Sequence, residues 1–357
     1  MVRTLRVAVI PGDGVGPEIS EACQPVIEAA ASRAEVQVEM AQLDWGGERH
    51  LRLGAPMPED GPAILRTFDA ALFGAVGRPD VPDHELIWGL IIRLRQELGL
   101  SVNLRPALTF PGVPSPLRDG AAIDLLVVRE NTEGEYAGAG GRLRNGSPSE
   151  VAVEVAIHSR AAISKAARFA FEAARRRRRR LHLVTKSNAM RYGYVLWDEA
   201  VAEVAGDYPD VSWERVLVDA MAARMVQRPG ELDVLLCSNL FGDILSDLAA
   251  ALVGGLGMAP SANIRPDQRL GVFEPVHGSA PDIAGRGIAN PSGYLLSAAM
   301  MFDHLEAGAA ADQIRSALAG ALQQPELRTP DLGGAATTAQ LASSVLAWVQ
   351  AGEGSRA

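Results

Sequence analysis

Cysteine is scarce in this sequence. Among 357 residues only Cys23 and Cys237 occur, and neither belongs to a CxxC pair or a Cys/His cluster. This pattern argues against a disulfide framework and against structural zinc, and it fits a reducing compartment. The cysteine content therefore predicts a cytoplasmic protein.

Long apolar runs are also absent from the sequence. No stretch approaches the roughly 18 residues of a membrane span. The first apolar segment, residues 7–10, is too short for the core of a signal peptide, and no small-residue cleavage pattern follows it. We expect no membrane partner.

Basic residues are outnumbered by acidic ones, 34 to 43, which gives a formal net charge of −9. This balance weighs against nucleic acid as the main partner, because phosphate binding needs a basic surface. It permits an anionic substrate, since a local arginine cluster can oppose the global sign.

Six consecutive arginines, residues 175–180, are the exception to the acidic balance. Two interpretations are open. The run is a nucleic-acid or nuclear-targeting segment, or it closes a long helix, where cations suit the negative end of the helix dipole. The net charge and the interspersed acidic residues favour the helix end, so we expect no nucleic-acid partner.

Short apolar runs alternate with longer helical patterns along the chain. This alternation predicts an α/β architecture with a mainly parallel sheet, and 48% hydrophobic content over this length allows a large core. Residues 151–157 are β-branched and alternating, as in one strand of an antiparallel hairpin. The predicted strands are residues 7–10, 70–73, 123–128, 181–184 and 232–237, and the predicted helices are residues 17–32, 86–98, 159–180, 241–252 and most of 291–350.

Two segments rich in proline or glycine, residues 109–116 and 254–260, are candidate crossing points between lobes. If both are crossings, the middle third of the chain is an inserted lobe. We expect a large lobe made of residues 1–104 and 257–357, and a small lobe made of residues 105–256.

A glycine-rich turn at residues 11–17 (PGDGVGP) follows the first strand and opens a helix. The dinucleotide fingerprint GxGxxG would sit there, but Pro17 occupies the position of its third glycine. A tight turn is favoured over direct phosphate contact.

A pair of carboxylates, Asp243 and Asp247, lies four residues apart on a predicted helix and therefore on one face. Ile244, Leu245 and Leu248 are expected to pack inward beside them. Two like charges side by side repel, and a hard divalent cation with oxygen ligands would compensate them. The alternative is a solvated acidic helix start near the positive end of the dipole.

Three arginines are candidates for anion binding. Arg95 lies on a predicted helix, Arg105 precedes Pro106 in a predicted loop, and Arg129 ends an apolar strand, where a buried cation needs an anionic partner. Converging guanidinium groups would bind a dicarboxylate bidentately, whereas ordinary salt bridges are the alternative for each residue alone.

Three further places in the chain carry groups for proton transfer or ligand binding. Tyr136 and Lys186 are possible proton-transfer groups, and Lys186 directly follows a strand, where ligand sites of α/β proteins gather. A surface tyrosine and a solvated lysine are the alternatives. The segment 274–285 (EPVHGSAPDIAG) forms a rigid loop in which Asp282 suits ribose hydroxyls and disfavours a 2′-phosphate, so it favours NAD over NADP.

Taken together, these motifs resemble the β-decarboxylating dehydrogenases, the family of isopropylmalate, isocitrate, homoisocitrate, tartrate and D-malate dehydrogenases. The resemblance covers about residues 5–345, and it rests on residues 11–18, 102–106, 128–136, 239–248 and 273–285. It implies a two-lobed fold with a mixed, mainly parallel sheet that is not a Rossmann fold. It also implies that NAD accepts a hydride from a 2-hydroxy diacid, which then loses its β-carboxylate as carbon dioxide.

The resemblance also assigns roles to individual residues. The large lobe would carry most of the NAD site, and the small lobe the metal aspartates and the interface of a homodimer whose active sites are shared. Lys186 and Asp219 would come from the second subunit. The implied groups are catalytic Lys186 and Tyr136; substrate-binding Arg95, Arg105 and Arg129; Mg²⁺ or Mn²⁺ ligands Asp219, Asp243 and Asp247; and NAD-binding Gly74, Val76, His277, Gly278, Ser279, Ala280, Pro281, Asp282 and Asn290. A monovalent cation such as K⁺ is a further expectation of the family, with no residue assigned to it here.

Within the family, residues 73–89 and 127–136 look most like the tartrate and D-malate dehydrogenase branch. Isopropylmalate enzymes usually carry a glutamate where Trp88 stands, so a bulky Trp88 beside the substrate would favour malate or tartrate; the alternative is a packing role for Trp88. Ile91 and Ile92 offer no hydrogen bond to a third carboxylate, which argues against isocitrate. They also suit a 3-alkyl group, so 3-isopropylmalate stays an open alternative. A non-catalytic regulatory subunit is disfavoured, because every implied site residue is present.

Overall fold

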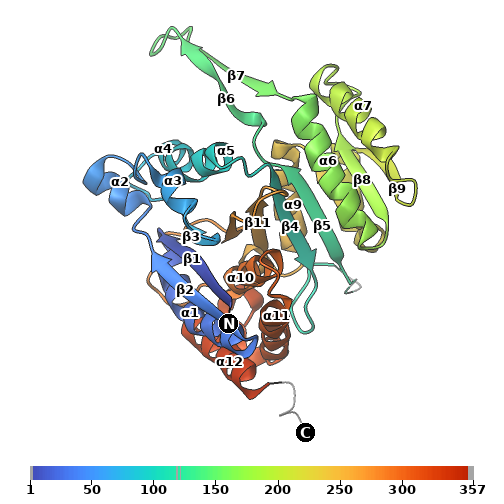
Figure 1. The fold of residues 1–357 in the computed structure, drawn as a ribbon. Coiled ribbons are helices and arrows are strands. Elements are labelled where there is room, and N and C mark those ends of the chain that lie inside the picture. Colours follow the sequence, from blue (N-terminus) through green and yellow to red (C-terminus); the bar gives the residue numbers. More distant parts are fainter. Residues whose placement is uncertain (1–2, 118–119, 121, 353–357) are drawn as a thin grey trace.

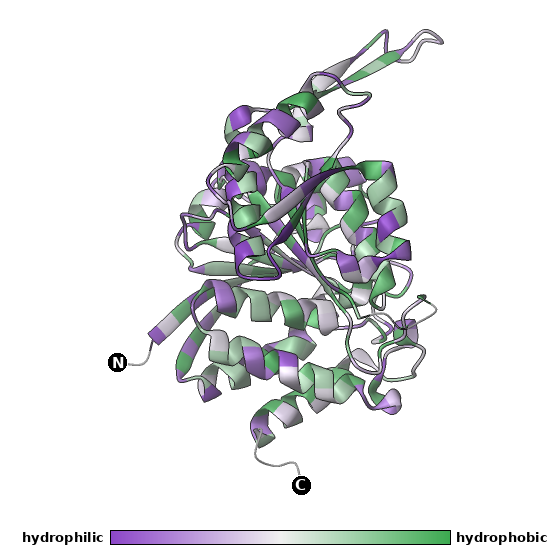
Figure 2. Ribbon diagram, turned by 90° about the vertical axis from the view of Figure 1, so that its right-hand side faces the viewer, coloured by the Kyte–Doolittle hydropathy of each residue, from purple (hydrophilic) through white to green (hydrophobic). Residues whose placement is uncertain are grey.

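The computed structural model describes residues 3–117, 120 and 122–352, and one ten-stranded mixed sheet organises them (Figure 1). A separate two-stranded arm projects from the end of the molecule opposite to α12 (Figures 1 and 2). In order across the large sheet, the strands are β2 (Val36–Gln42), β1 (Arg3–Gly12), β3 (Ala70–Ala75), β12 (Gly271–Pro275), β11 (Pro260–Ile264), β4 (Val102–Leu108), β5 (Asp124–Glu130), β10 (Val234–Cys237), β8 (Arg180–Thr185) and β9 (Ser212–Leu217).

The large sheet is parallel on both sides of an antiparallel centre. The three antiparallel pairings are β12–β11, β11–β4 and β4–β5, and the remaining neighbours run parallel. The predicted α/β class with a mixed, mainly parallel sheet is thus confirmed. The sheet continues through β4, which contains the expected lobe boundary at residues 104–105, so the division into two lobes stays a prediction.

Helices cover the sheet and connect its strands. The predicted helical tail is confirmed as α10, α11 and α12. The helices are α1 (Gly16–Arg33), α2 (Gly47–Leu53), α3 (Gly61–Leu65), α4 (Asp83–Ile87), the π-helical turn η1 (Trp88–Ile92), α5 (Arg93–Glu97), α6 (Arg160–Arg175), α7 (Gly193–Ala205), α8 (Val218–Gln227), α9 (Asn239–Leu252), α10 (Ser292–His304), α11 (Gly308–Leu322) and α12 (Thr338–Ala351), with short 3₁₀ turns η2 (Pro229–Glu231), η3 (Leu256–Met258), η4 (Pro325–Leu327) and η5 (Pro330–Leu332).

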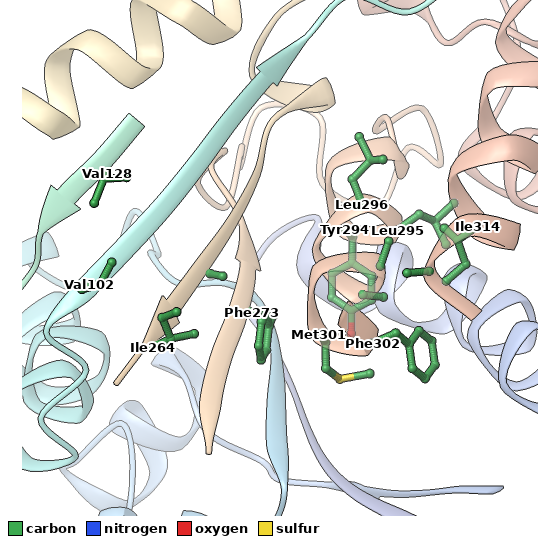
Figure 3. Close-up of a cluster of buried hydrophobic side chains, with 14 of the residues drawn as sticks. Val102, Val128, Ile264, Phe273, Tyr294, Leu295, Leu296, Met301, Phe302 and Ile314 are labelled. Carbon is green, nitrogen blue, oxygen red and sulfur yellow. The ribbon is translucent and has the colours of Figure 1, made fainter. Parts of the chain in front are cut away.

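The main core lies between the sheet and the C-terminal helices. Figure 3 shows Ile264 and Phe273 of the sheet facing Phe302 of α10 and Ile314 of α11. Burying each such side chain contributes about 1.5–3 kcal/mol. Because α10 packs between the sheet and other helices, nearly all of its side chains are buried, and Asp303 near its C-terminal end is exposed.

Local signals set the ends of several helices. The hydroxyl of Ser159 accepts a hydrogen bond from the backbone N–H of Ala162 and caps the start of α6. Thr337 and Gln340 form a reciprocal capping box at the start of α12. No helix in the described ranges is both long enough and apolar enough to cross a bilayer.

The predicted helix over residues 159–180 is wrong at its C-terminal end. The helix α6 stops at Arg175, Arg179 turns the chain with a φ of 57°, and Arg180 already begins β8. Buried Asp233 explains the turn, because its carboxylate accepts hydrogen bonds from the Arg177 side chain and the Arg178 backbone. These contacts give the arginine run a structural role.

The arm consists of β6 (Gly134–Leu143) and β7 (Val151–Ile157), which pair in antiparallel fashion. The hairpin expected from residues 151–157 is confirmed. Gly138 bends β6 with a φ of 76°, and a Cβ added there would lie 3.0 Å from the Trp88 ring. A larger residue at position 138 would therefore disturb the base of the arm.

Candidate active site

A cavity of about 240 Å³ gathers most of the predicted substrate residues. Its walls come from β3, β12, the helical segment of residues 83–97, and single side chains of β4, β5, β6 and α9. Larger hollows of about 390 Å³ beside Arg33, about 630 Å³ beside Asp198 and about 420 Å³ beside His182 are lined, in the described part of the chain, by none of the predicted site residues. The smaller cavity is therefore the candidate active site.

The guanidinium groups of Arg95, Arg105 and Arg129 converge on this cavity. Arg105 lies in β4 and not in the predicted loop, so the strand fixes its direction. Burial, and then repulsion from Arg105, lowers the pKa of Arg129. Among the lining residues only Asp243 and Glu274 are anionic, and this excess of positive charge favours an anionic ligand.

Asp243 is the anionic partner that the position of Arg129 predicts. Its carboxylate lies 2.5 Å from Arg129 and 3.2 Å from Arg105. Burial tends to raise the pKa of Asp243, but the charges of Arg129 and Arg105 outweigh it and lower that pKa.

Asp247 lies one turn further along α9. Its carboxylate is 3.3 Å from Arg105, and burial raises its pKa. The side chains of Asp243 and Asp247 are 37% and 52% exposed, so both keep oxygen atoms accessible to a hard divalent cation. No group of three or more possible metal ligands lies together in the described part of one chain. At this position one chain therefore offers a divalent cation two ligands, Asp243 and Asp247.

The helix α9 differs from expectation at one apolar position. Leu245 packs inward as predicted, but Ile244 is 57% exposed. Successive residues of an α-helix are rotated by about 100°, so Ile244 and Leu245 point in different directions, and only Leu245 faces the core.

Tyr136 connects the base of the arm to the carboxylates. Its hydroxyl donates a hydrogen bond to Asp243 over 3.1 Å, and its ring lies under the Arg129 guanidinium at 5.6 Å. Burial raises the pKa of Tyr136, so the phenol holds its proton next to the cavity.

Lys186 and Asp219 form a separate pair. Lys186 follows β8 directly and Asp219 lies in the first turn of α8, and their charged groups are 2.5 Å apart. The hydrogen bond from Lys186 lowers the pKa of Asp219. Neither residue lines the cavity of its own chain.

The predicted cofactor residues continue from one edge of the cavity. Gly74, Val76, His277 and Gly278 line it, and Ser279, Ala280, Pro281 and Asp282 follow in the chain. The loop is tied to the glycine-rich turn, since Val15 donates its backbone N–H to the Ser279 carbonyl. Positive φ angles at Gly12 and Gly14 confirm the tight turn, and a Cβ at Gly14 would lie 1.9 Å from the Ser279 oxygen.

Among the described residues, two buried polar atoms of the cavity lining have no hydrogen-bond partner, Nε of Arg95 and Nε2 of His277. Leaving such a group unpaired costs roughly 1–3 kcal/mol. A polar ligand in the cavity would supply the missing partners, and this fits a cofactor next to His277. Asn290, the remaining predicted cofactor residue, is buried and donates to Asp331 over 3.0 Å, outside the cavity lining.

The apolar wall of the cavity is formed by Ile87, Ile91 and Ile92. Trp88 is 38% exposed and lies against Gly138 of the arm, outside the lining. Sequence reasoning missed Ile87, although it precedes Ile91 by one helical turn, a spacing that places both on one face. It also missed Glu274, which pairs with Arg95 over 3.0 Å.

Comparison with known proteins identifies relatives along nearly the whole chain. The family model "Isocitrate/isopropylmalate dehydrogenase" matches residues 6–345. A probable tartrate dehydrogenase/decarboxylase of Agrobacterium vitis is 47% identical over 96% of this chain and 97% of its own length. The D-malate dehydrogenase (decarboxylating) of Escherichia coli (strain K12) is 43% identical, over 97% and 98% of the two chains.

A solved structure confirms the fold expected from the resemblance. The isocitrate dehydrogenase of Methylococcus capsulatus superposes with a TM-score of 0.89 at 37% sequence identity. The match covers 97% of this chain and 99% of the other.

Proposed function

The chain belongs to the isocitrate/isopropylmalate dehydrogenase family, and on that premise we propose that it oxidises and decarboxylates a small 2-hydroxy diacid of the D-malate or tartrate type. The proposed cofactors are NAD and Mg²⁺ or Mn²⁺. Relatives named for tartrate and D-malate support the substrate class. The reduced, buried cysteines fit a cytoplasmic enzyme.

The observation that carries the proposal is the convergence of two buried arginines, Arg105 and Arg129, and the partly buried Arg95 on a small cavity. Guanidinium groups bind carboxylates bidentately, and burial strengthens each contact. Arg95, Arg105 and Arg129 would hold the two substrate carboxylates in one orientation. Orientation of this kind lowers the barrier to reaction by fixing the reacting atoms near each other.

A divalent cation would be held by Asp243 and Asp247 of one subunit and Asp219 of the other. When bound, such a cation polarises the substrate oxygens and lowers the pKa of the 2-hydroxyl. Lys186 of the second subunit would accept the hydroxyl proton, directly or through water. Tyr136, which holds its proton beside Asp243, would deliver it to C3 after carbon dioxide leaves.

The cofactor side of the cavity suits NAD. His277 and the loop from Gly278 to Asp282 would hold the adenosine half, with Asn290, and Gly74 and Val76 would border the nicotinamide half. NAD supplies the hydride acceptor. The Asp282 carboxylate would accept hydrogen bonds from ribose hydroxyls and repel a 2′-phosphate.

A homodimer is part of this proposal, and the arm supports it. Val151, Val153, Val155 and Ile157 alternate along β7, and each is at least 38% exposed. A two-stranded hairpin is marginal by itself in water, so an exposed apolar row on it favours contact with a second copy. Ile244 on α9 is a further exposed apolar side chain.

A second candidate substrate is 3-isopropylmalate or another 3-alkylmalate. The observation that favours it is the apolar wall of Ile87, Ile91 and Ile92, which offers no polar group to a substituent at C3. The same wall disfavours isocitrate, whose third carboxylate would be desolvated without a partner.

The test is NADH formation with Mn²⁺ and K⁺ present, measured in parallel for D-malate, tartrate, 3-isopropylmalate and isocitrate. We expect the highest kcat/KM for D-malate or tartrate. A preference for 3-isopropylmalate of more than about tenfold, roughly 1.4 kcal/mol of transition-state stabilisation, would favour the second candidate. Turnover of none of the four would contradict the proposed function.

A further inference from the structure

A chain of buried hydrogen bonds connects Arg105 to Glu274, and both of these residues line the cavity. Nε of Arg105 donates to the side-chain oxygen of Asn103 over 2.9 Å. The amide nitrogen of Asn103 donates to the side-chain oxygen of Asn263 over 3.0 Å. The amide nitrogen of Asn263 then donates to Glu274 over 2.7 Å, and Arg95 donates to the same carboxylate oxygen over 3.0 Å.

The direction of this chain is fixed by its charged ends. A guanidinium group only donates and a carboxylate only accepts, so Asn103 must turn its oxygen to Arg105 and Asn263 its nitrogen to Glu274. The two amide dipoles consequently point the same way, from a cation to an anion. Each bond in such a chain polarises the next in a buried environment.

The two asparagines occupy a defined place in the sheet. Asn103 on β4 and Asn263 on β11 are register partners in the antiparallel centre, and both are fully buried. The side chain of Asn263 is saturated, because its oxygen also accepts from Asn131 and its nitrogen also donates to the Val272 carbonyl. These contacts leave Asn263 one orientation.

We propose that Asn103 and Asn263 are positioning residues that hold Arg105 and Glu274, and through Glu274 also Arg95, at a fixed separation for a dicarboxylate. The inference rests on the proposed function and adds residues that do not line the cavity. A free arginine side chain loses rotamer entropy on being fixed. Fixing it before the substrate arrives moves that cost from binding to folding.

Asn131 provides a matched control within the same cluster. It is also buried, and it donates to the Asn263 oxygen over 3.0 Å and to the Leu100 carbonyl over 2.9 Å. Its hydrogen bond to Asn263 is a side branch of the network and is not one of the bonds that connect Arg105 to Glu274. Asn263→Ala interrupts the path, whereas Asn131→Ala removes the branch alone.

The experiment compares the full-length wild type with Asn263→Ala and Asn131→Ala. Three quantities are measured: KM for D-malate, KM for NAD, and the calorimetric Kd of D-malate with Mn²⁺ and without NAD, where no turnover occurs. We expect Asn263→Ala to raise the D-malate KM and Kd by at least about tenfold and to change the NAD KM by less than about twofold. Asn131→Ala should leave all three within about twofold.

Thermal unfolding measured in parallel separates positioning from general destabilisation. If Asn263→Ala does not fold, Asn103→Ser serves instead, because a serine hydroxyl is too short to bridge Arg105 and Asn263. A folded variant with unchanged D-malate KM and Kd, or equal effects in Asn131→Ala, would overturn the positioning role while the wild type stays active. A wild type that neither binds nor oxidises D-malate, tartrate or 3-isopropylmalate would overturn the proposed function and this inference together.

Discussion

The side-chain nitrogen of Lys186 lies 2.5 Å from a carboxylate oxygen of Asp219, and neither residue lines the cavity that gathers the arginines. The pair sits where β8 ends and α8 begins. The family resemblance assigns both residues to the reaction. Sharing of active sites between two subunits would let the pair act in the cavity of a second copy.

Mixing two inactive variants tests this sharing. Lys186→Ala and Asp243→Asn should each lose nearly all activity as homodimers. A dimer containing one of each has one complete site, so random 1:1 mixing by co-expression should restore about a quarter of wild-type activity. Co-expression of Lys186→Ala with Asp219→Asn is the control, because both changes fall in the same half-site. Activity that stays near zero in the first mixture would place Lys186 and Asp243 in the site of one chain.

Metal binding by the α9 carboxylates can be measured through stability. Removing divalent ions with a chelator should lower the midpoint of thermal unfolding, and adding Mn²⁺ should restore it. At about 100 times Kd the expected gain is about 2.7 kcal/mol. Asp247→Asn should lose most of this Mn²⁺-dependent gain, while the exposed Asp210→Asn should keep it. A full Mn²⁺ response in Asp247→Asn would contradict the assignment of that ligand.

Substrate selection should depend on Ile91 more than on Trp88, because Ile91 lines the cavity and Trp88 contacts Gly138 of the arm. Ile91→Ala enlarges the space beside C3. It should raise kcat/KM for 3-isopropylmalate relative to D-malate by about tenfold, the scale of one or two methylene groups. Trp88→Ala should change the ratio by less than about threefold. A larger change in this kcat/KM ratio for Trp88→Ala than for Ile91→Ala would support the hypothesis that Trp88 sets the pocket size.

The arginine run should matter for stability through Asp233. This carboxylate is fully buried and bonds the Arg177 side chain and the Arg178 backbone. Asp233→Ala leaves those donors without their acceptor and should reduce the free energy of unfolding by roughly 3–5 kcal/mol. The exposed pair of Arg175 with Asp210 is the control, and Asp210→Ala should reduce the free energy of unfolding far less, because water screens the pair. Equal losses in urea denaturation would contradict the structural role of Asp233.

Acid sensitivity should arise partly at His182. Burial, followed by the positive charge of Arg224, lowers its pKa, although Glu214 opposes this effect. In the unfolded chain the His182 imidazole takes up a proton near pH 6.5, whereas in the folded chain it stays neutral until a lower pH. The free energy of unfolding therefore falls as the pH drops below that value. His182→Gln cannot titrate and should show a smaller fall in unfolding midpoint between about pH 7.5 and pH 5. Exposed His84→Gln is the control, and a slope unchanged by His182→Gln would contradict the prediction.

The sequence by itself determined the α/β class, the tight glycine turn, the hairpin at residues 151–157 and the three candidate arginines. These features are local: strand and helix periodicity repeat within a few residues, and positive φ angles need glycine at the turn itself. The local pattern predicted the wrong end for the helix that begins at residue 159. The helix stops at Arg175 because of contacts with buried Asp233, which is distant in sequence and leaves no signal near residues 175–180.

Only the tertiary structure decided which side chains meet. Arg95 and Glu274 are 179 residues apart in sequence, and Asn103 and Asn263 are 160 apart. Their contacts follow from the order β12–β11–β4–β5, which mixes strands from both ends of the chain. Strand order depends on the packing of whole layers and not on periodicity within one segment. For the same reason, only the packing of residues 83–97 against the arm and the sheet shows that Ile87 lines the cavity and that Trp88 lies against Gly138.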